Sequence, residues 1–198
     1  MLVFWAEKLV FFAVPKTGTT SIEMALRPVA GVAITDPPIV KHTPVYRYRR
    51  FLKPYFEACG GPDFETIAIM REPVSWLGSW YRYRARPELD GQKNSTAGIS
   101  FDAFVAAYLE PKRPSFAQVG SQAKFLDDGT GQPGVDRLFR YEDPGALHGF
   151  LEERLARKLE FKRLNASPPM ELSLSRELQR RLRDEAALEF EFYAQAGL

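Results

Sequence analysis

A short apolar run that leads directly into a glycine-containing loop constrains this chain most. Residues 10–14 (VFFAV) carry no polar side chain, which is typical of a strand buried on both faces of a sheet. The loop at 15–21 (PKTGTTS) follows at once, and Ile22, Ala25 and Leu26 then recur at helical spacing. The order strand, tight loop, helix directs successive backbone N–H groups and the positive end of the helix dipole toward one point. We therefore expect the loop to bind a polyanion.

The side chains of this loop strengthen that expectation. Lys16 supplies a full positive charge, and the hydroxyl groups that follow supply hydrogen-bond donors. The residues predicted to bind the anion are Pro15, Lys16, Thr17, Gly18, Thr19, Thr20 and Ser21. The loop is not a Walker loop, because its lysine precedes its only glycine instead of following a second one. A tight strand–helix turn with an incidental lysine is the structural alternative.

The rest of the chain repeats the alternation of apolar runs and helical patterns. Further strands are expected at 29–34, 66–70 and 135–141. Helices are expected at 46–56, 74–84, 101–109, 144–159 and from Ser173 or Ser175 to the C-terminus. Ser100 is the expected N-cap of the helix at 101–109. Strands that alternate with helices predict an α/β fold with a parallel sheet, and 198 residues allow one domain over 1–198.

A second motif follows the strand expected at 66–70. Arg71 stands at the strand end, Pro73 comes two residues later, and Ser79 lies eight residues after the arginine. Arginine makes forked, charge-assisted contacts to phosphate, and proline at a first helical position points a helix N-terminus at the same place. A surface ion pair and an ordinary helix hydroxyl are the alternative roles of these two residues.

The two motifs together resemble the nucleotide-binding loops of the sulfotransferases, which use 3′-phosphoadenosine-5′-phosphosulfate (PAPS) as sulfuryl donor. The resemblance implies their fold, a parallel sheet of the P-loop NTPase type flanked by helices. It also implies that 15–21 hold the 5′-phosphosulfate, that Arg71 and Ser79 hold the 3′-phosphate, and that no metal is needed. Weaker landmarks of the carbohydrate-type branch are 121–126, 138–143, 165–167 and 189–193, and Lys162 or Arg163 could replace a C-terminal nucleotide loop.

Sulfuryl transfer needs charge stabilisation on the leaving group and a base for the acceptor hydroxyl. Lys16 is placed to neutralise the leaving 5′-phosphate. His42 is the first candidate for the base, because the strand and proline-containing loop before it should return to the carboxyl edge of the sheet. A surface or helix-capping histidine is the alternative. Glu23, in the helix expected after the loop at 15–21, is the second candidate base, with a carboxylate on the helix surface or one paired with a lysine as its alternative role.

Two basic strips bear on the acceptor. The segment 41–53 is rich in lysine and arginine with interleaved tyrosines, and no acid stands between Asp36 and Glu57. Arg82, Arg84 and Arg86 form a second cluster. Both could hold an anionic carbohydrate or small-molecule acceptor, and both could equally be solvated helix faces.

Composition excludes several other classes. One cysteine, Cys59, and two histidines rule out a disulfide framework, a cysteine-rich zinc site and a three-histidine metal centre. A net charge of +2 does not favour nucleic acid, and no apolar run is long enough to span a bilayer. With no basic leader, we expect a cytoplasmic protein. A divergent P-loop kinase of nucleotides or sugars, and a non-catalytic nucleotide-binding module, remain the alternative functions.

Overall fold

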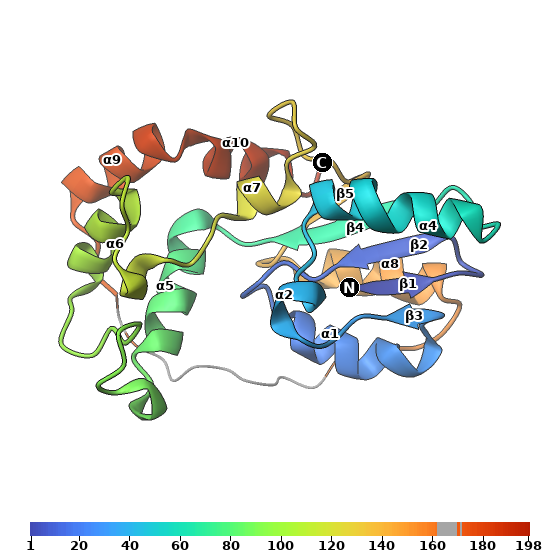
Figure 1. The fold of residues 1–198 in the computed structure, drawn as a ribbon, viewed down its shortest axis with the longest axis horizontal. Coiled ribbons are helices and arrows are strands. Elements are labelled where there is room, and N and C mark those ends of the chain that lie inside the picture. The colour runs from blue at the N-terminus through green and yellow to red at the C-terminus, as the bar shows by residue number, and fades with distance from the viewer. Residues whose placement is uncertain (162–169, 171) are drawn as a thin grey trace.

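A five-stranded mixed sheet forms the centre of the molecule in a computed structural model of the chain, which describes residues 1–161, 170 and 172–198. The spatial order of the strands is β3 (Val32–Ala33), β1 (Leu2–Phe4), β2 (Leu9–Phe12), β4 (Glu65–Met70) and β5 (Arg137–Arg140), as Figure 1 shows. β2, β4 and β5 are parallel, whereas β1 runs antiparallel to both β2 and β3. The α/β class is therefore confirmed.

The expectation of a wholly parallel sheet is wrong, because the N-terminal residues form a hairpin. Residues 5–8 turn the chain tightly: Lys8 takes a left-handed φ of 52°, and its N–H donates to the Trp5 carbonyl at 3.3 Å. β1 therefore folds back onto β2 instead of crossing over a helix. The strand expected at 29–34 is also mostly wrong, since η1 (Arg27–Val29) is a 3-10 turn and only Val32 and Ala33 pair with β1.

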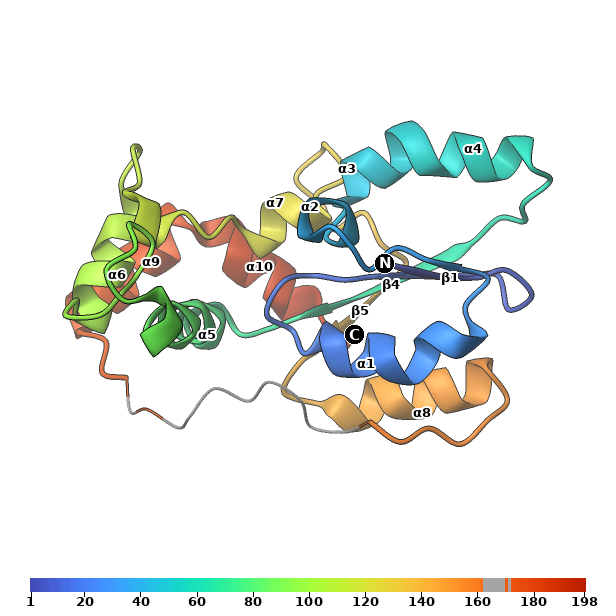
Figure 2. The same ribbon diagram turned by 60° about the horizontal axis from the view of Figure 1, so that its bottom comes forward.

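β1 and β2 are buried on both faces, as the apolar run at 10–14 predicts for β2, whereas no residue of β3 or β5 is fully buried. Val10 and Phe12 pack into a core beneath α3 (Val45–Arg47), the π-helical turn η2 (Tyr48–Leu52) and α4 (Lys53–Ala58). Leu9 and Phe11 pack into a second core with α1 (Thr19–Leu26) and α8 (Pro144–Arg154) on the opposite face. Figure 2 shows the two helical layers on either side of the sheet.

A separate helical group lies beyond the carboxyl ends of the parallel strands (Figure 1). It consists of α5 (Pro73–Arg84), α6 (Phe101–Leu109) and α9 (Arg176–Glu185), which share a third core. The remaining elements are α2 (Pro38–Lys41), η3 (Pro87–Leu89), η4 (Ser115–Ala117), α7 (Gln122–Leu126) and α10 (Ala187–Gln195). The helices that follow the two predicted anion-binding motifs, α1 and α5, thus pack in different hydrophobic cores.

The expected helices are confirmed, and all but α6 have shifted ends. α6 has the predicted bounds and the predicted cap, since the Ser100 hydroxyl accepts from the Ala103 N–H at 3.1 Å. α8 ends at Arg154, five residues before the expected end, and Ala156 has a left-handed φ of 48°. The terminal helix starts after Ser175 but is interrupted at Ala186. The landmark at 165–167 and the candidates Lys162 and Arg163 lie outside the described residues.

Candidate active site

The two predicted anion-binding motifs lie side by side at one edge of the sheet. β2 leads into the loop at 15–18, and β4, its parallel neighbour, ends one residue before Arg71. Carboxyl ends of adjacent parallel strands meet at the same edge, where α/β proteins bind ligands. Nη1 of Arg71 is 3.5 Å from the carbonyl oxygen of Lys16. The chain thus brings its two motifs together across 55 residues of sequence.

The phosphate loop is held in its shape by contacts on both sides. Lys16 and Gly18 have left-handed φ values of 66° and 74°, which makes two sharp turns in three residues. The Thr17 hydroxyl donates to the Val14 carbonyl at 2.9 Å, so this hydroxyl is committed within the loop. The indole N–H of Trp76 in α5 donates to the Pro15 carbonyl at 2.9 Å. The loop is therefore tied to the strand before it and to the helix after Arg71.

Gly18 is the residue before α1, and it has no side chain with which to accept from the first-turn amides. A Cβ at this position would lie 3.4 Å from Tyr141 and would share the left-handed backbone, so glycine suits the site. Of the following hydroxyl residues, Thr19 is buried, whereas Thr20 and Ser21 are half-buried. In the first turn, the Ser21 N–H donates to the Gly18 carbonyl at 3.2 Å.

Lys16 lies in a cationic and aromatic environment. Its ammonium nitrogen is 4.3 Å from the centre of the Tyr83 ring and 5.5 Å from that of Trp80. Burial, and then the charges of Arg86, Arg71 and Arg82, lower the pKa of Lys16 to about 8. Within the described part of the chain, the buried indole N–H of Trp80 has no hydrogen-bond partner. An anion placed here would relieve the mutual repulsion of these cations.

Arg71 is held from three directions. Its Nε donates to the Ser75 hydroxyl at 2.8 Å, and its guanidinium carbon is 4.4 Å from the centre of the Tyr141 ring. The buried Gln122 clamps its backbone: the amide side chain accepts from the Arg71 N–H and donates to the Arg71 carbonyl, each at 2.9 Å. Burial lowers the pKa of the Arg71 guanidinium. The forked end of Arg71 is thus positioned near the loop before any ligand binds.

Ser79 lies in α5 one helical turn after Ser75, and it is buried. Residues four apart share one face of a helix, so Ser79 is on the face that carries the partner of Arg71. The three arginines of the second basic strip have separate roles. Arg82 and Arg86 act on the charge of Lys16, whereas Arg84 donates to the carbonyls of Ser115 and Gln118, at 2.6 and 2.8 Å. Arg84 therefore supports the fold and does not extend the cationic site.

His42 directly follows α2 and lies beside the strand end. Its Nδ1 is 2.6 Å from the carbonyl oxygen of Ala13, the residue after β2. A carbonyl oxygen only accepts hydrogen bonds, so Nδ1 carries the hydrogen and Nε2 of the neutral ring keeps its lone pair. Burial lowers the pKa of His42, which keeps the ring neutral at physiological pH. The ring thus has the protonation state that a general base requires.

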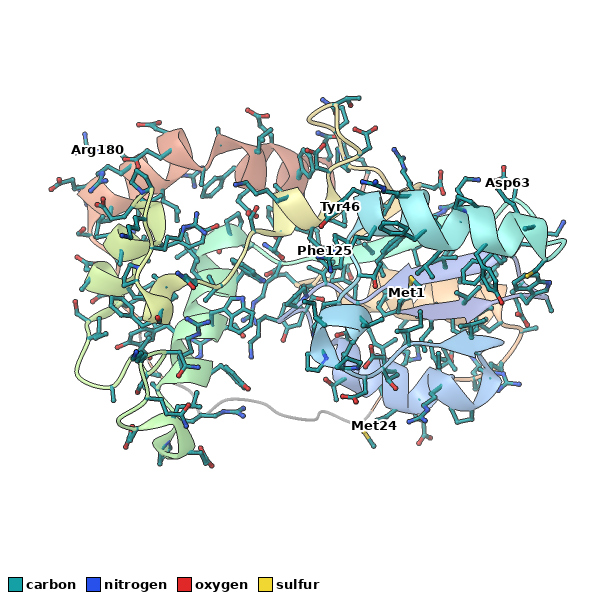
Figure 3. All side chains as sticks on the ribbon, in the orientation of Figure 1. Met1, Met24, Tyr46, Asp63, Phe125 and Arg180 are labelled. Atoms are coloured by element: carbon teal, nitrogen blue, oxygen red, sulfur yellow. The ribbon has the colours of Figure 1, made fainter. Side chains whose placement is uncertain are left out.

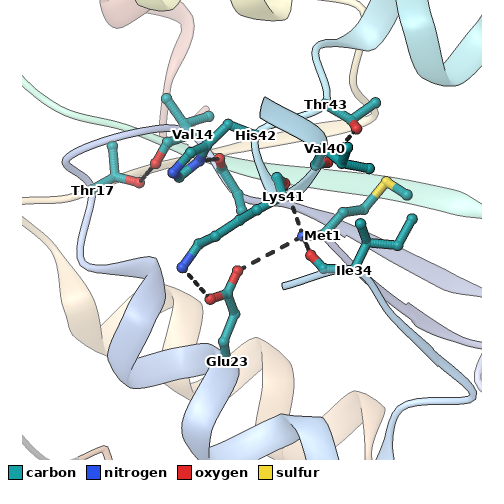
Figure 4. Close-up of polar contacts among 10 residues, drawn as sticks. Met1, Val14, Thr17, Glu23, Ile34, Val40, Lys41, His42 and Thr43 are labelled. Carbon is teal, nitrogen blue, oxygen red and sulfur yellow. Dashed lines mark hydrogen bonds and ion pairs between the residues drawn. The ribbon is translucent and has the colours of Figure 1, made fainter. Parts of the chain in front are cut away.

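Glu23 is a buried carboxylate paired with a lysine, which is one of the two alternative roles that the sequence leaves open, and it does not lie on the helix surface. It is 4% exposed, and its Oε2 lies 2.5 Å from Nζ of Lys41 (Figure 4). Its Oε1 is 3.7 Å from the Met1 amino nitrogen, which itself donates to the carbonyls of Ile34 and Lys41. A carboxylate in this position supports α1 against α2, and His42 is the better candidate base.

Several residues that contribute to the site are not predicted by the two sequence motifs. Trp76, Trp80 and Tyr83 follow one another on one face of α5 and place aromatic rings against the loop and Lys16. Their spacing of four and three residues is a signal that could have been read from the sequence. Gln122 is different, because nothing local to residues 121–126 indicates a contact with Arg71.

Other features lie away from this site. A cavity of about 290 Å³ is lined by residues that include Arg49, Thr66 and Asp136. Because Thr66 is the second residue of β4 and Asp136 directly precedes β5, this cavity is at the opposite edge of the sheet. Among the described residues, no group of three or more His, Cys, Asp and Glu side chains is placed to hold a metal ion.

No protein-family model, no curated protein and no solved structure matches this chain. None of the helices that the structure describes combines the length and apolar character needed to cross a bilayer.

Proposed function

We propose that this protein is a sulfotransferase that moves a sulfuryl group from PAPS to a hydroxyl of a carbohydrate or other small acceptor. One observation carries the proposal: Lys16 and Arg71, the charged residues of the two motifs, meet at the ends of adjacent parallel strands, with Arg71 Nη1 3.5 Å from the Lys16 carbonyl. A donor nucleotide with phosphates at its 5′ and 3′ positions needs two cationic sites at a short separation.

Each site has a defined role. Lys16 and the backbone N–H groups of 17–20 bind the 5′-phosphosulfate and take up the negative charge that forms on the leaving phosphate. Arg71, with the Ser79 hydroxyl, binds the 3′-phosphate. The positive charges that lower the pKa of Lys16 belong to arginines. Arginine side chains bind phosphate groups well, so these residues suit a donor that carries several negative charges.

His42 supplies the base. The acceptor oxygen attacks sulfur, its proton passes to Nε2 of His42, and the bond between sulfur and the bridging phosphate oxygen breaks. The products are a sulfate ester and 3′,5′-ADP. The hydrogen bond from Nδ1 to the Ala13 carbonyl orients the ring and stabilises the imidazolium that forms.

Calorimetric titration with 3′,5′-ADP and with ATP plus magnesium tests the nucleotide assignment. We expect tight binding of 3′,5′-ADP, weakened roughly tenfold to a hundredfold by Arg71→Ala, as loss of a charged hydrogen bond implies. Arg180→Ala, a change at an exposed arginine of α9, is the control and should bind like the wild type. Preference for ATP with magnesium would instead favour the kinase.

Activity is tested separately with radioactive PAPS and a panel of sugar acceptors. Lys16→Ala should lower the rate of sulfuryl transfer by orders of magnitude, because the variant lacks the positive charge that stabilises the leaving phosphate. Binding of 3′,5′-ADP together with no transfer to any acceptor, in an assay that detects a known sulfotransferase, would favour the non-catalytic module.

A further inference from the structure

The helical segment from Val45 to Ala58 places large aromatic side chains in solvent. Its inner side is apolar, because Val45, Tyr48 and Phe56 pack into the core above the sheet. On its outer side, Tyr46 is 51%, Phe51 60% and Tyr55 64% exposed. Three aromatic side chains so exposed on one short segment need an explanation beyond folding. Figures 1 and 2 show this segment lying along the outside of the sheet.

Unpaired arginines stand among these rings. Arg47 and Arg50 have no acidic partner among the residues that the structure describes, and each lies against a neighbouring ring, at 5.7 Å from Tyr46 and 5.2 Å from Phe51. The other cations of the segment are neutralised locally: Arg49 pairs with Asp128 and Lys53 with Glu57. The outer side therefore combines exposed aromatic area with net positive charge.

The aromatic and basic side chains form a continuous surface along the outer side of the segment. Arg47, Phe51 and Tyr55 follow one another at intervals of four residues, and Tyr46 and Arg50 form the adjacent row. Aromatic and basic side chains on one side of a helix are the pattern of segments that lie in the headgroup layer of a bilayer. The rings enter the interface, and the arginines bind lipid phosphates.

The positive charge of this surface favours a lipid bilayer over a second copy of the chain as its binding partner. A symmetric contact between two copies through this surface would bring Arg47 and Arg50 of both copies into one interface, where their like charges repel. An anionic membrane complements the arginines and also accommodates protruding rings. We propose that the outer side of Val45–Ala58 binds the surface of an anionic lipid bilayer, and this proposal is independent of the sulfotransferase assignment.

The test measures binding to lipid vesicles without any nucleotide. The full chain should sediment with phosphatidylcholine vesicles that contain about 30% phosphatidylserine, and not with phosphatidylcholine alone. Phe51→Ser with Tyr55→Ser, and separately Arg47→Glu with Arg50→Glu, should each weaken binding roughly tenfold or more. A fluorophore on Cys59, which is exposed and is the only cysteine, should shift to the blue as the segment enters the interface.

The matched controls are on the far side of the molecule and at another exposed apolar residue. Arg176→Glu with Arg180→Glu makes the same charge change on α9, where Figure 3 labels Arg180, and Met24→Ser removes an apolar side chain that is 63% exposed. Both should bind vesicles like the wild type. Failure of the wild type to bind anionic vesicles would overturn the proposal, as would loss of binding only in the α9 variant. A lipid-free dimer that Phe51→Ser with Tyr55→Ser dissociates would also overturn it in favour of self-association.

Discussion

Replacing Lys16 by methionine should stabilise the ligand-free protein while it removes nucleotide binding. Burial, together with the charges of three arginines, lowers the pKa of the half-buried Lys16 ammonium group from 10.5 to about 8. A charge whose pKa is lowered in this way opposes folding. Methionine keeps a flexible apolar side chain against the rings of Trp80 and Tyr83 and carries no charge.

The magnitude follows from the pKa. At 1.36 kcal/mol per pKa unit, a fall from 10.5 to about 8 corresponds to roughly 3 kcal/mol of unfavourable free energy in the folded state. Partial exposure screens the charge, and loss of two cation–π contacts costs about 0.5–1 kcal/mol. We therefore expect Lys16→Met to raise the free energy of unfolding by about 1–2 kcal/mol near pH 7.

The gain should depend on pH in a defined direction. Below about pH 8 the lysine is protonated in both the folded and the unfolded state, so the wild type bears the whole penalty. Between pH 8 and 10.5 the folded state loses the proton while the unfolded state keeps it, so the penalty shrinks. The advantage of Lys16→Met should consequently be largest near neutral pH and smaller at about pH 9.5.

Urea unfolding of both proteins at the two pH values measures this difference. Lys8→Met is the matched control, because Lys8 also has a left-handed backbone, with φ of 52°, but its side chain is exposed. That variant should change the free energy of unfolding by less than about 0.5 kcal/mol at either pH. A Lys16→Met protein that is less stable than the wild type at pH 7, or whose advantage is the same at both pH values, would refute the electrostatic argument.

Three further substitutions test the site. Gln122→Leu removes both hydrogen bonds to the Arg71 backbone and should lower the free energy of unfolding by about 2–4 kcal/mol and weaken 3′,5′-ADP binding; unchanged affinity in the folded variant would show that Gln122 does not position Arg71. His42→Gln should slow sulfuryl transfer by about 10²–10⁴-fold and abolish the fall in rate that protonation of His42 causes at acidic pH; a retained acid limb would place the base elsewhere. Glu23→Gln leaves the half-buried Lys41 without its partner and should cost about 3 kcal/mol of stability, part of which Lys41→Met restores. Inactivity of that folded double variant would give Glu23 a direct part in the reaction.

The sequence alone predicts the elements whose signals are local. β4 and α6 are found within a residue of their observed ends, and the Ser100 cap is identified from the residue before the helix. The strand–loop–helix order around Gly18 is predicted in the same way, because an apolar run, a glycine-containing loop and a helical repeat lie within a few residues of one another. These features depend on backbone preferences and on hydrogen bonds between near neighbours.

Only the tertiary structure decides which distant residues meet. It folds β1 back as an antiparallel strand, pairs Glu23 with Lys41, and assigns Arg84 to the fold while Arg82 and Arg86 remain near Lys16. The physical reason is that a contact between distant segments depends on how whole elements pack, and no pattern within either segment records its partner. The positive charges of the site can therefore be predicted from the sequence, whereas their assembly from two strand ends and one helix depends on the fold.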